Sequence, residues 1–183
     1  MNITLPSPAR VLVVGTSAAG KSTFAQQLAA AAALPLVQLD PLFWDQDWKP
    51  KPKEAFVRLV ESATSQQAWV VDGNYGSVRE QLWPKANVVI WLNYSLPVVF
   101  WRGLKRTVLR IASGQELWHG NRESFRRAFL SRDSILVWIL TTHARRTREF
   151  KALQASGTYS LEWIEFSSPR QARQWLTGQA HAV

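Results

Sequence analysis

Residues 15–22 have the types and the spacing of a loop that binds phosphate groups. Gly15, Gly20, Lys21 and Ser22 occupy the fixed positions of the pattern G-x-x-x-x-G-K-[ST]. The glycines let the backbone curl so that several N–H groups point at one phosphate, the lysine reaches the β- and γ-phosphates, and the serine hydroxyl can ligate Mg²⁺. The other predicted nucleotide-binding residues of this segment are Thr16, Ser17, Ala18, Ala19 and Thr23. The pattern predicts that the chain binds ATP or GTP together with Mg²⁺, and GTP is the less expected of the two.

The residues on both sides of this loop support the same interpretation. Val11 to Val14 form a short apolar run, as expected of a strand buried in a parallel sheet. Residues 22–33 are rich in alanine and predict a helix whose N-terminus, with its partial positive charge, faces the phosphates. A strand, a glycine-containing loop and a helix in this order favour a phosphate-binding loop over a chance match in a turn.

Two acidic residues come at the ends of other predicted strands. Asp40 ends the predicted strand 36–40, and Asp72 ends the apolar strand 68–72. We predict that Asp72, with Ser22, holds Mg²⁺ directly or through water. Asp40 could bind an acceptor hydroxyl or act as a base. The alternatives are that Asp72 is an ordinary turn residue before Gly73 and that Asp40 is a cap or turn residue.

The positive charge of the chain is concentrated in one segment. The net charge is +9 over 183 residues, and residues 101–150 carry +7 of it, because they hold eleven lysines and arginines against four acids. Such a cluster suits the phosphates of a nucleotide or of nucleic acid, and the alternative is a solvated helix face. Within it, Arg122 and Arg126 follow a glycine-containing loop, and we predict that they close over the phosphates and stabilise transition-state charge.

The composition and the length of the chain limit the classes of protein to which it can belong. A chain of 183 residues with 46% hydrophobic residues predicts a single domain, residues 1–183, with a substantial core. There is no cysteine, no apolar run approaches the ~20 residues that span a bilayer, and the first residues do not resemble a signal peptide. We expect a cytoplasmic protein without a membrane partner, present as a monomer or a dimer.

Strand-like and helix-like segments alternate along the chain and predict an α/β fold. The predicted strands are 11–14, 36–40, 68–72, 87–92 and 159–166, and the predicted helices are 22–33, 53–67, 77–83, 96–111, 122–155 (interrupted near 131–134) and 170–176. This order implies a parallel sheet with helices on both faces and a ligand crevice at the carboxyl ends of the strands. Arg102, Arg106 and Arg110 recur every four residues and therefore line one side of the helix 96–111.

Several motifs together resemble a known family. The loop at 15–22, the segment L-D-P-L-F-W at 39–44, the segment W-V-V-D-G-N-Y at 69–75 and the arginine-rich segment are similar to those of bacterial adenylate-kinase-like P-loop proteins, many of which are labelled topology modulation proteins. The resemblance covers nearly the whole chain. It implies a three-layer fold with a five-stranded parallel sheet of order 2-3-1-4-5, ATP binding, a mobile lid at about 113–133, and Arg170 near the adenine.

The chain departs from adenylate kinase where that enzyme binds its acceptor. Adenylate kinase has D-G-F-P-R after its third strand, whereas Asp72 and Gly73 are followed here by Asn74 and Tyr75, without the proline and the arginine. The segment 41–44 also lacks the cation that grips an acceptor phosphate, although Arg79 could substitute. Phe43, Trp44, Trp48 and Tyr75 could stack on a base or face a sugar ring, and the alternative is that these aromatic side chains cover the core. The predicted acceptor-binding residues are Asp40, Phe43, Trp44, Gly73, Asn74, Tyr75 and Arg79.

These patterns lead to one main functional hypothesis and two alternatives. The chain is predicted to be a kinase that transfers the γ-phosphate of ATP to a small acceptor, either nucleotide-like or a hydroxyl-bearing metabolite. One alternative is a nucleic-acid-binding ATPase or regulator that affects DNA topology through residues 101–150. The other is an ATP-dependent switch that engages a protein.

Overall fold

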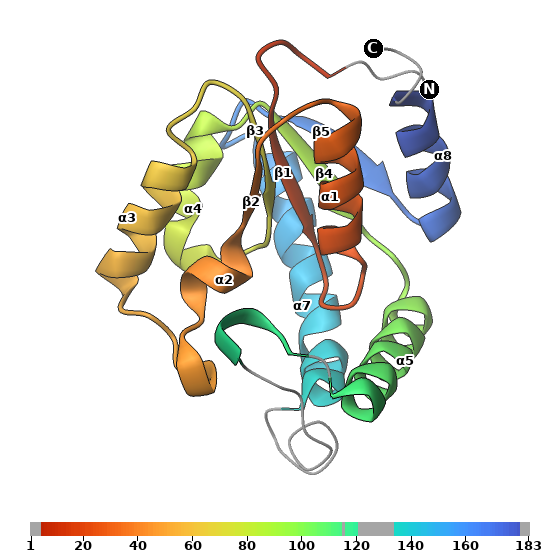
Figure 1. The fold of residues 1–183 in the computed structure, drawn as a ribbon. Coiled ribbons are helices and arrows are strands. Elements are labelled where there is room, and N and C mark those ends of the chain that lie inside the picture. Colours follow the sequence, from red (N-terminus) through yellow and green to blue (C-terminus); the bar gives the residue numbers. More distant parts are fainter. Residues whose placement is uncertain (1–4, 115, 121–133, 180–183) are drawn as a thin grey trace.

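The computed structural model describes residues 5–114, 116–120 and 134–179. Its centre is a sheet of five strands, β1 (Arg10–Gly15), β2 (Leu36–Gln38), β3 (Trp69–Asp72), β4 (Val88–Leu92) and β5 (Glu162–Phe166). The strands are parallel and lie in the order β2-β3-β1-β4-β5, which confirms the predicted topology (Figure 1).

The burial of each strand follows from its residues. Val11 to Val14 of β1 and all of β3 and β4 are buried, as expected of apolar strands that helices cover on both faces. β5 lies at the edge and alternates, with Ile164 and Phe166 buried while Glu162 and Glu165 are exposed. Charged residues on an edge strand discourage pairing with another chain.

Helices cover both faces of the sheet. The elements that follow the strands are α1 (Lys21–Ala31), α2 (Leu39–Phe43), α3 (Lys53–Ala63), α4 (Arg79–Leu82), α5 (Leu96–Ser113), α7 (Ile135–Ser156) and α8 (Pro169–Gln179), with short turns η1 (Gln46–Trp48), η2 (Gly76–Val78), η3 (Trp83–Lys85) and η4 (Trp118–Gly120). Val13 shares a buried cluster with Leu28 of α1 and Trp175 of α8. Its neighbour Leu12 belongs to a second cluster with Phe56 of α3 and Phe150 of α7. The sheet is therefore the middle of three layers, with α8 beside α1 on one face (Figure 1).

The structure corrects the predicted boundaries of several elements. β2 ends at Gln38, and Asp40 lies in the first turn of α2 rather than at a strand end, because Pro41 is tolerated in a first helical turn. The helix predicted over 53–67 ends at Ala63, and the hydroxyl of Thr64 donates to the carbonyl of Val60 over 2.8 Å. The last strand begins at Glu162 rather than at Tyr159.

The predicted lid lies largely outside the described residues. Arg122 and Arg126 belong to that part, so their predicted roles stay predictions. α5 extends to Ser113 and ends at Gly114, whose φ of 59° is the left-handed conformation that glycine adopts without strain. Ser134 caps α7 by accepting a hydrogen bond from the backbone N–H of Leu136 over 3.2 Å. Among the described residues, no helix is both long and apolar enough to cross a membrane.

Candidate active site

The phosphate-binding loop follows β1 directly and leads into α1, as predicted. Gly15 has a φ of 149° and Gly20 a φ of 95°, conformations that residues with a Cβ atom rarely adopt. A Cβ at Gly15 would lie 2.7 Å from the carbonyl oxygen of Leu92 in β4, and a Cβ at Gly20 would lie 2.6 Å from Nη2 of Arg102 in α5. Both glycines therefore suit the positive φ values of the loop, and at Gly15 the backbone of Leu92 also leaves no room for a side chain. Gly20 also offers no side chain to cap α1, which leaves the helix N-terminus facing the loop.

Lys21 is the first residue of α1 and lies in a strongly charged environment. Its Nζ donates to the carbonyl oxygen of Thr16 over 3.3 Å, which folds the side chain back over the loop. Burial lowers the pKa of Lys21, and the positive charges of Arg106 and Arg146 lower it further, whereas Asp72 and Asp40 oppose the shift. The lysine is thus close to both of the acids that the sequence singled out.

Asp72 and Ser22, the two predicted magnesium ligands, lie together. Burial raises the pKa of Asp72, while the charge of Lys21 and a hydrogen bond from the Ser22 hydroxyl oppose that rise. The Oδ1 atom of Asp72 is buried and finds no hydrogen-bond partner among the described residues. A carboxylate and a hydroxyl oxygen beside a phosphate-binding loop are the partial ligand set that Mg²⁺ uses, since this ion retains waters and binds substrate phosphates. The residues present therefore fit the predicted ion.

Asp40 and Tyr75 form a hydrogen-bonded pair near Lys21. The Tyr75 hydroxyl donates to Oδ1 of Asp40 over 2.6 Å. Burial raises the pKa of Tyr75, and the negative charge of Asp40 adds to the effect, so the phenol remains protonated and acts as a donor. Because the charge of Asp40 also affects Lys21 and Asp72, these residues belong to one site. Asp40 reaches it from α2 instead of from a strand end.

The aromatic residues of this region contact one another. The ring of Phe43 lies 4.6 Å from that of Tyr75, 4.8 Å from that of Trp44 and 5.1 Å from that of the buried Phe56. These contacts favour the alternative that the rings cover the core beneath α2. Contact of Phe43, Trp44 or Tyr75 with an acceptor stays a prediction.

Asn74 and Arg79 follow Asp72 and Gly73 at the same edge of the sheet. The side-chain oxygen of Asn74 is buried and has no hydrogen-bond partner within the described chain. Gly73 has a φ of 136°, and a Cβ there would lie 3.0 Å from Cβ of Leu39. Arg79 forms an ion pair with Glu149 of α7, and its guanidinium lies 5.3 Å above the ring of Trp83. The acceptor cation that the sequence suggested is thus paired within the chain.

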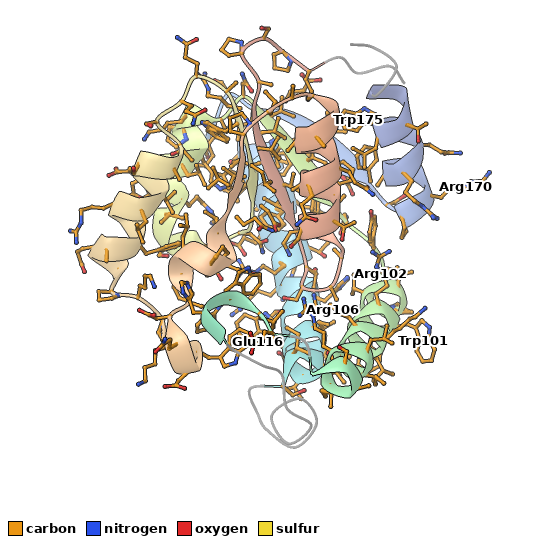
Figure 2. All side chains as sticks on the ribbon, viewed as in Figure 1. Trp101, Arg102, Arg106, Glu116, Arg170 and Trp175 are labelled. Atoms are coloured by element: carbon orange, nitrogen blue, oxygen red, sulfur yellow. The ribbon has the colours of Figure 1, made fainter. Side chains whose placement is uncertain are left out.

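Two arginines of α5 lie at the phosphate-binding loop and were not predicted as site residues. Figure 2 shows Arg102 and Arg106 on the side of α5 that faces the loop, in agreement with the approach of Arg102 to Gly20 and the effect of Arg106 on Lys21. With Lys105, Leu109 and Arg110 they line a shallow, open surface depression of about 470 Å³. Part of the basic segment therefore faces the loop where nucleotide phosphates are predicted.

Gly103 explains how α5 comes so close to the loop. A Cβ at Gly103 would lie 2.7 Å from Cδ1 of Ile139 in α7 and 3.3 Å from Cβ of Ala18 in the loop. A side chain here would require Ile139 to move its terminal methyl and Ala18 to shift slightly, so glycine permits the close approach. A glycine inside a helix with arginines at every fourth position was the signal in the sequence that could have identified this face.

Two other predicted features differ in their distance from this centre. Arg170 is exposed in the first turn of α8, and Figure 2 shows its side chain pointing outward. Its predicted place near the adenine stays a prediction. The described end of the predicted lid, η4, contacts the acceptor side, since Nε2 of His119 lies 3.1 Å from the carbonyl oxygen of Pro41.

The fold is similar to that of two proteins of known structure. One is a gluconokinase from Sinorhizobium meliloti 1021, with a TM-score of 0.52, 18% sequence identity, and coverage of 96% of this chain and 93% of the gluconokinase chain. The other is a shikimate kinase from Bacteroides thetaiotaomicron, with a TM-score of 0.57, 14% identity, and coverage of 95% of this chain and 97% of the other. At these identities the likeness shows the fold alone. The chain has the fold of P-loop kinases.

No protein-family model and no curated protein matches the sequence. Membership of the topology modulation family therefore stays a prediction.

Proposed function

We propose that this protein is an ATP-dependent phosphotransferase that moves the γ-phosphoryl group of ATP to a hydroxyl group of a small molecule. The observation that carries the proposal is the arrangement of Lys21, Asp72 and Asp40. They come from three separate elements, yet each affects the protonation of another at one edge of the sheet. Phosphoryl transfer requires this combination of positive charge for the phosphates, a carboxylate for Mg²⁺ and a second carboxylate for the acceptor.

The donor is proposed to lie along the loop 15–22 and beside α5. The N-terminus of α1 and Lys21 would face the β- and γ-phosphates, while Arg102 and Arg106 add positive charge from α5. Ser22 and Asp72 would hold Mg²⁺, which neutralises charge that develops on the phosphate oxygens during transfer. Fixed positive groups around the transferring phosphoryl stabilise the transition state without rearrangement.

The acceptor is proposed to lie between Asp40 and Asn74. The oxygen of the acceptor hydroxyl forms a bond to the γ-phosphorus, and the bond from the γ-phosphorus to the β-phosphate oxygen breaks. Asp40 accepts the proton that the hydroxyl group loses. The products are the phosphorylated acceptor and ADP, and the proton passes from Asp40 to water. Tyr75 fixes the carboxylate by its 2.6 Å hydrogen bond and so orients the base. Both structural neighbours are kinases by name, which supports this reaction class.

Substitution of Lys21 tests the proposal. Purified wild-type protein, Lys21→Ala and the control Lys53→Ala, an exposed lysine at the start of α3, are incubated with γ-labelled ATP, Mg²⁺ and a panel of nucleosides, sugars and polyols. The proposal expects transfer of label by the wild type and the control, and its loss in Lys21→Ala with an unchanged circular dichroism spectrum. ATP hydrolysis without transfer to any acceptor of a broad panel would contradict it.

A further inference from the structure

Three charged side chains on the second face of the sheet form a closed set of ion pairs. Arg79, at the start of α4, donates through Nη2 to Oε1 of Glu149. Arg146, one turn before Glu149 on α7, donates through Nη1 to Oε2 over 3.1 Å. The side chains of Arg79, Arg146 and Glu149 are 19%, 20% and 28% exposed. Each carboxylate oxygen of Glu149 thus binds a different guanidinium, and we call this group the Glu149 clamp.

The Glu149 clamp borders the proposed acceptor site. The charge of Arg146 contributes to lowering the pKa of Lys21, so this guanidinium lies within electrostatic reach of the transferring phosphoryl. Arg79 follows Tyr75 by four residues and starts the helix after the acceptor segment 73–75. Its guanidinium also lies over the ring of Trp83, a contact that adds to the ion pair with Glu149 in holding it in place.

The charges around the acceptor segment do not favour an anion. Asp40 and Asp72 place two carboxylates there, and Lys21 is committed to the phosphates of the donor. Arg79 and Arg146, two further cations of this region, share one carboxylate, whereas Arg102 and Arg106 reach the phosphate-binding loop from α5. Although burial of Glu149 disfavours its ionised form, the two arginines more than offset this and hold its pKa below the ordinary value, so the clamp stays paired at neutral pH.

We propose that Glu149 sets the charge class of the acceptor. It occupies, from within the chain, the position between two guanidiniums that a carboxylate or phosphate of an acceptor would take. The acceptor is therefore a hydroxyl compound without an anionic group, such as a nucleoside, a neutral sugar or a polyol. This inference rests on the proposed phosphotransferase function and specifies its substrate class.

The experiment compares matched pairs of compounds that differ in one anionic group. Wild-type protein, Glu149→Ala and the control Glu162→Ala are saturated with Mg²⁺ and a non-hydrolysable ATP analogue, which occupies the phosphate-binding loop. Glu162 is an exposed glutamate at the start of β5 and receives the same substitution. Calorimetric titrations and thermal shifts then measure the binding of three pairs, each with the neutral member first: adenosine and AMP, glucitol and gluconate, and methyl shikimate and shikimate. Binding of inorganic phosphate is measured in the same way.

We expect the wild type and the control to bind a neutral member at least about tenfold more tightly than its anionic partner, the effect of one unit charge at about 10 Å and an effective dielectric constant near 20. Neither should bind inorganic phosphate under these conditions. In Glu149→Ala the preference should reverse, and inorganic phosphate should bind and raise the melting temperature.

Each outcome decides the inference. Tighter binding of the anionic members by the wild type overturns it, and so does a folded Glu149→Ala that keeps the wild-type preference. If Glu149→Ala does not fold, the wild-type preferences decide alone. If no member of any pair binds, the gain or absence of phosphate binding in Glu149→Ala decides. The proposed function fails separately, when a compound that binds receives no phosphoryl group from ATP.

Discussion

A single methyl group added at Gly15 should destabilise the protein far more than the same group added at Gly20. Gly15→Ala places Cβ 2.7 Å from the carbonyl oxygen of Leu92, which belongs to the backbone of a central strand and cannot move without distorting the sheet. A non-glycine residue at the φ of 149° costs about 1–3 kcal/mol. The overlap with a packed neighbour adds about 1–3 kcal/mol. Together these terms lower the unfolding free energy by about 4 kcal/mol.

Gly20→Ala meets the far end of a flexible side chain instead. Its φ of 95° costs about 1–2 kcal/mol, and Nη2 of Arg102, 2.6 Å from the added Cβ, can rotate away. The unfolding free energy of Gly20→Ala should therefore fall by only the conformational cost of about 1–2 kcal/mol. Its nucleotide binding should fall as well, because Arg102 is displaced from the loop. The loss of one charge-assisted contact predicts about tenfold weaker binding of an ATP analogue.

Thermal unfolding followed by circular dichroism separates the two substitutions. For a chain of this length, about 2–4 °C of melting temperature corresponds to 1 kcal/mol. Gly15→Ala should therefore melt about 10 °C below the wild type, and Gly20→Ala about 3–6 °C below it. Titration calorimetry with a non-hydrolysable ATP analogue measures the second effect. If both variants melt within 2 °C of each other (roughly 1 kcal/mol), the contact at Leu92 does not constrain Gly15, and the reasoning is wrong.

Three further substitutions test individual parts of the site. Arg102→Gln should weaken binding of an ATP analogue about tenfold by calorimetry, whereas Arg145→Gln, an exposed arginine of α7, should leave it unchanged. Tyr75→Phe removes the donor to Asp40 and should lower the unfolding free energy in urea by about 1–2 kcal/mol and slow phosphoryl transfer; wild-type transfer rates would show that Tyr75 does not orient the base. Because burial raises the pKa of Asp72, the native state holds this proton more tightly than the unfolded chain, and unfolding free energy falls as pH rises above the ordinary value of 3.8. Asp72→Asn should therefore stabilise the protein in urea at neutral pH and give no gain below that value, and destabilisation at neutral pH would refute this assignment.

The sheet and the phosphate-binding loop could be predicted because their determinants are local. Five apolar runs separated by helical segments define a parallel sheet, and the strand order followed from the resemblance to adenylate-kinase-like proteins. Each fixed position of the loop has a conformational or chemical requirement that the residue type reveals. The left-handed conformations at Gly15 and Gly20 are the ones that such a loop requires.

Asp40 shows the limit of that approach. The segment 36–40 was predicted as a strand that ends at Asp40, and the structure instead has a helical turn that begins at Leu39. The distinction depends on the packing of Phe43 against Phe56 and Tyr75, residues that lie far away in the sequence. The residue type was therefore informative about chemistry, although the element that carries it was predicted wrongly.

The arginines of α5 and the Glu149 clamp could not be placed from the sequence for a related reason. A repeat of four residues shows that Arg102 and Arg106 share a side of a helix, but the direction of that side depends on the contact of Gly103 with Ile139 and Ala18. Arg79 and Glu149 are separated by seventy residues, and their pairing exists only because α4 and α7 cover the same face of the sheet.

The distribution of charge about Lys21 connects these observations. Arg102 and Arg106 approach the loop from α5, whereas Asp40 and Asp72 approach Lys21 from α2 and β3. A polyphosphate is attracted to the first side and repelled from the second, because a charge interacts strongly over these distances in a partly buried site. Since Lys21 interacts with Arg106 as well as with both carboxylates, a triphosphate bound along the loop would place its terminal phosphate where the two charged regions meet. An acceptor without negative charge can approach that phosphate on the acidic side, and a hydroxyl group there meets Asp40. The same asymmetry that orients the donor thus limits the acceptor, which is why the charge of Glu149 is expected to matter for substrate choice rather than for folding alone.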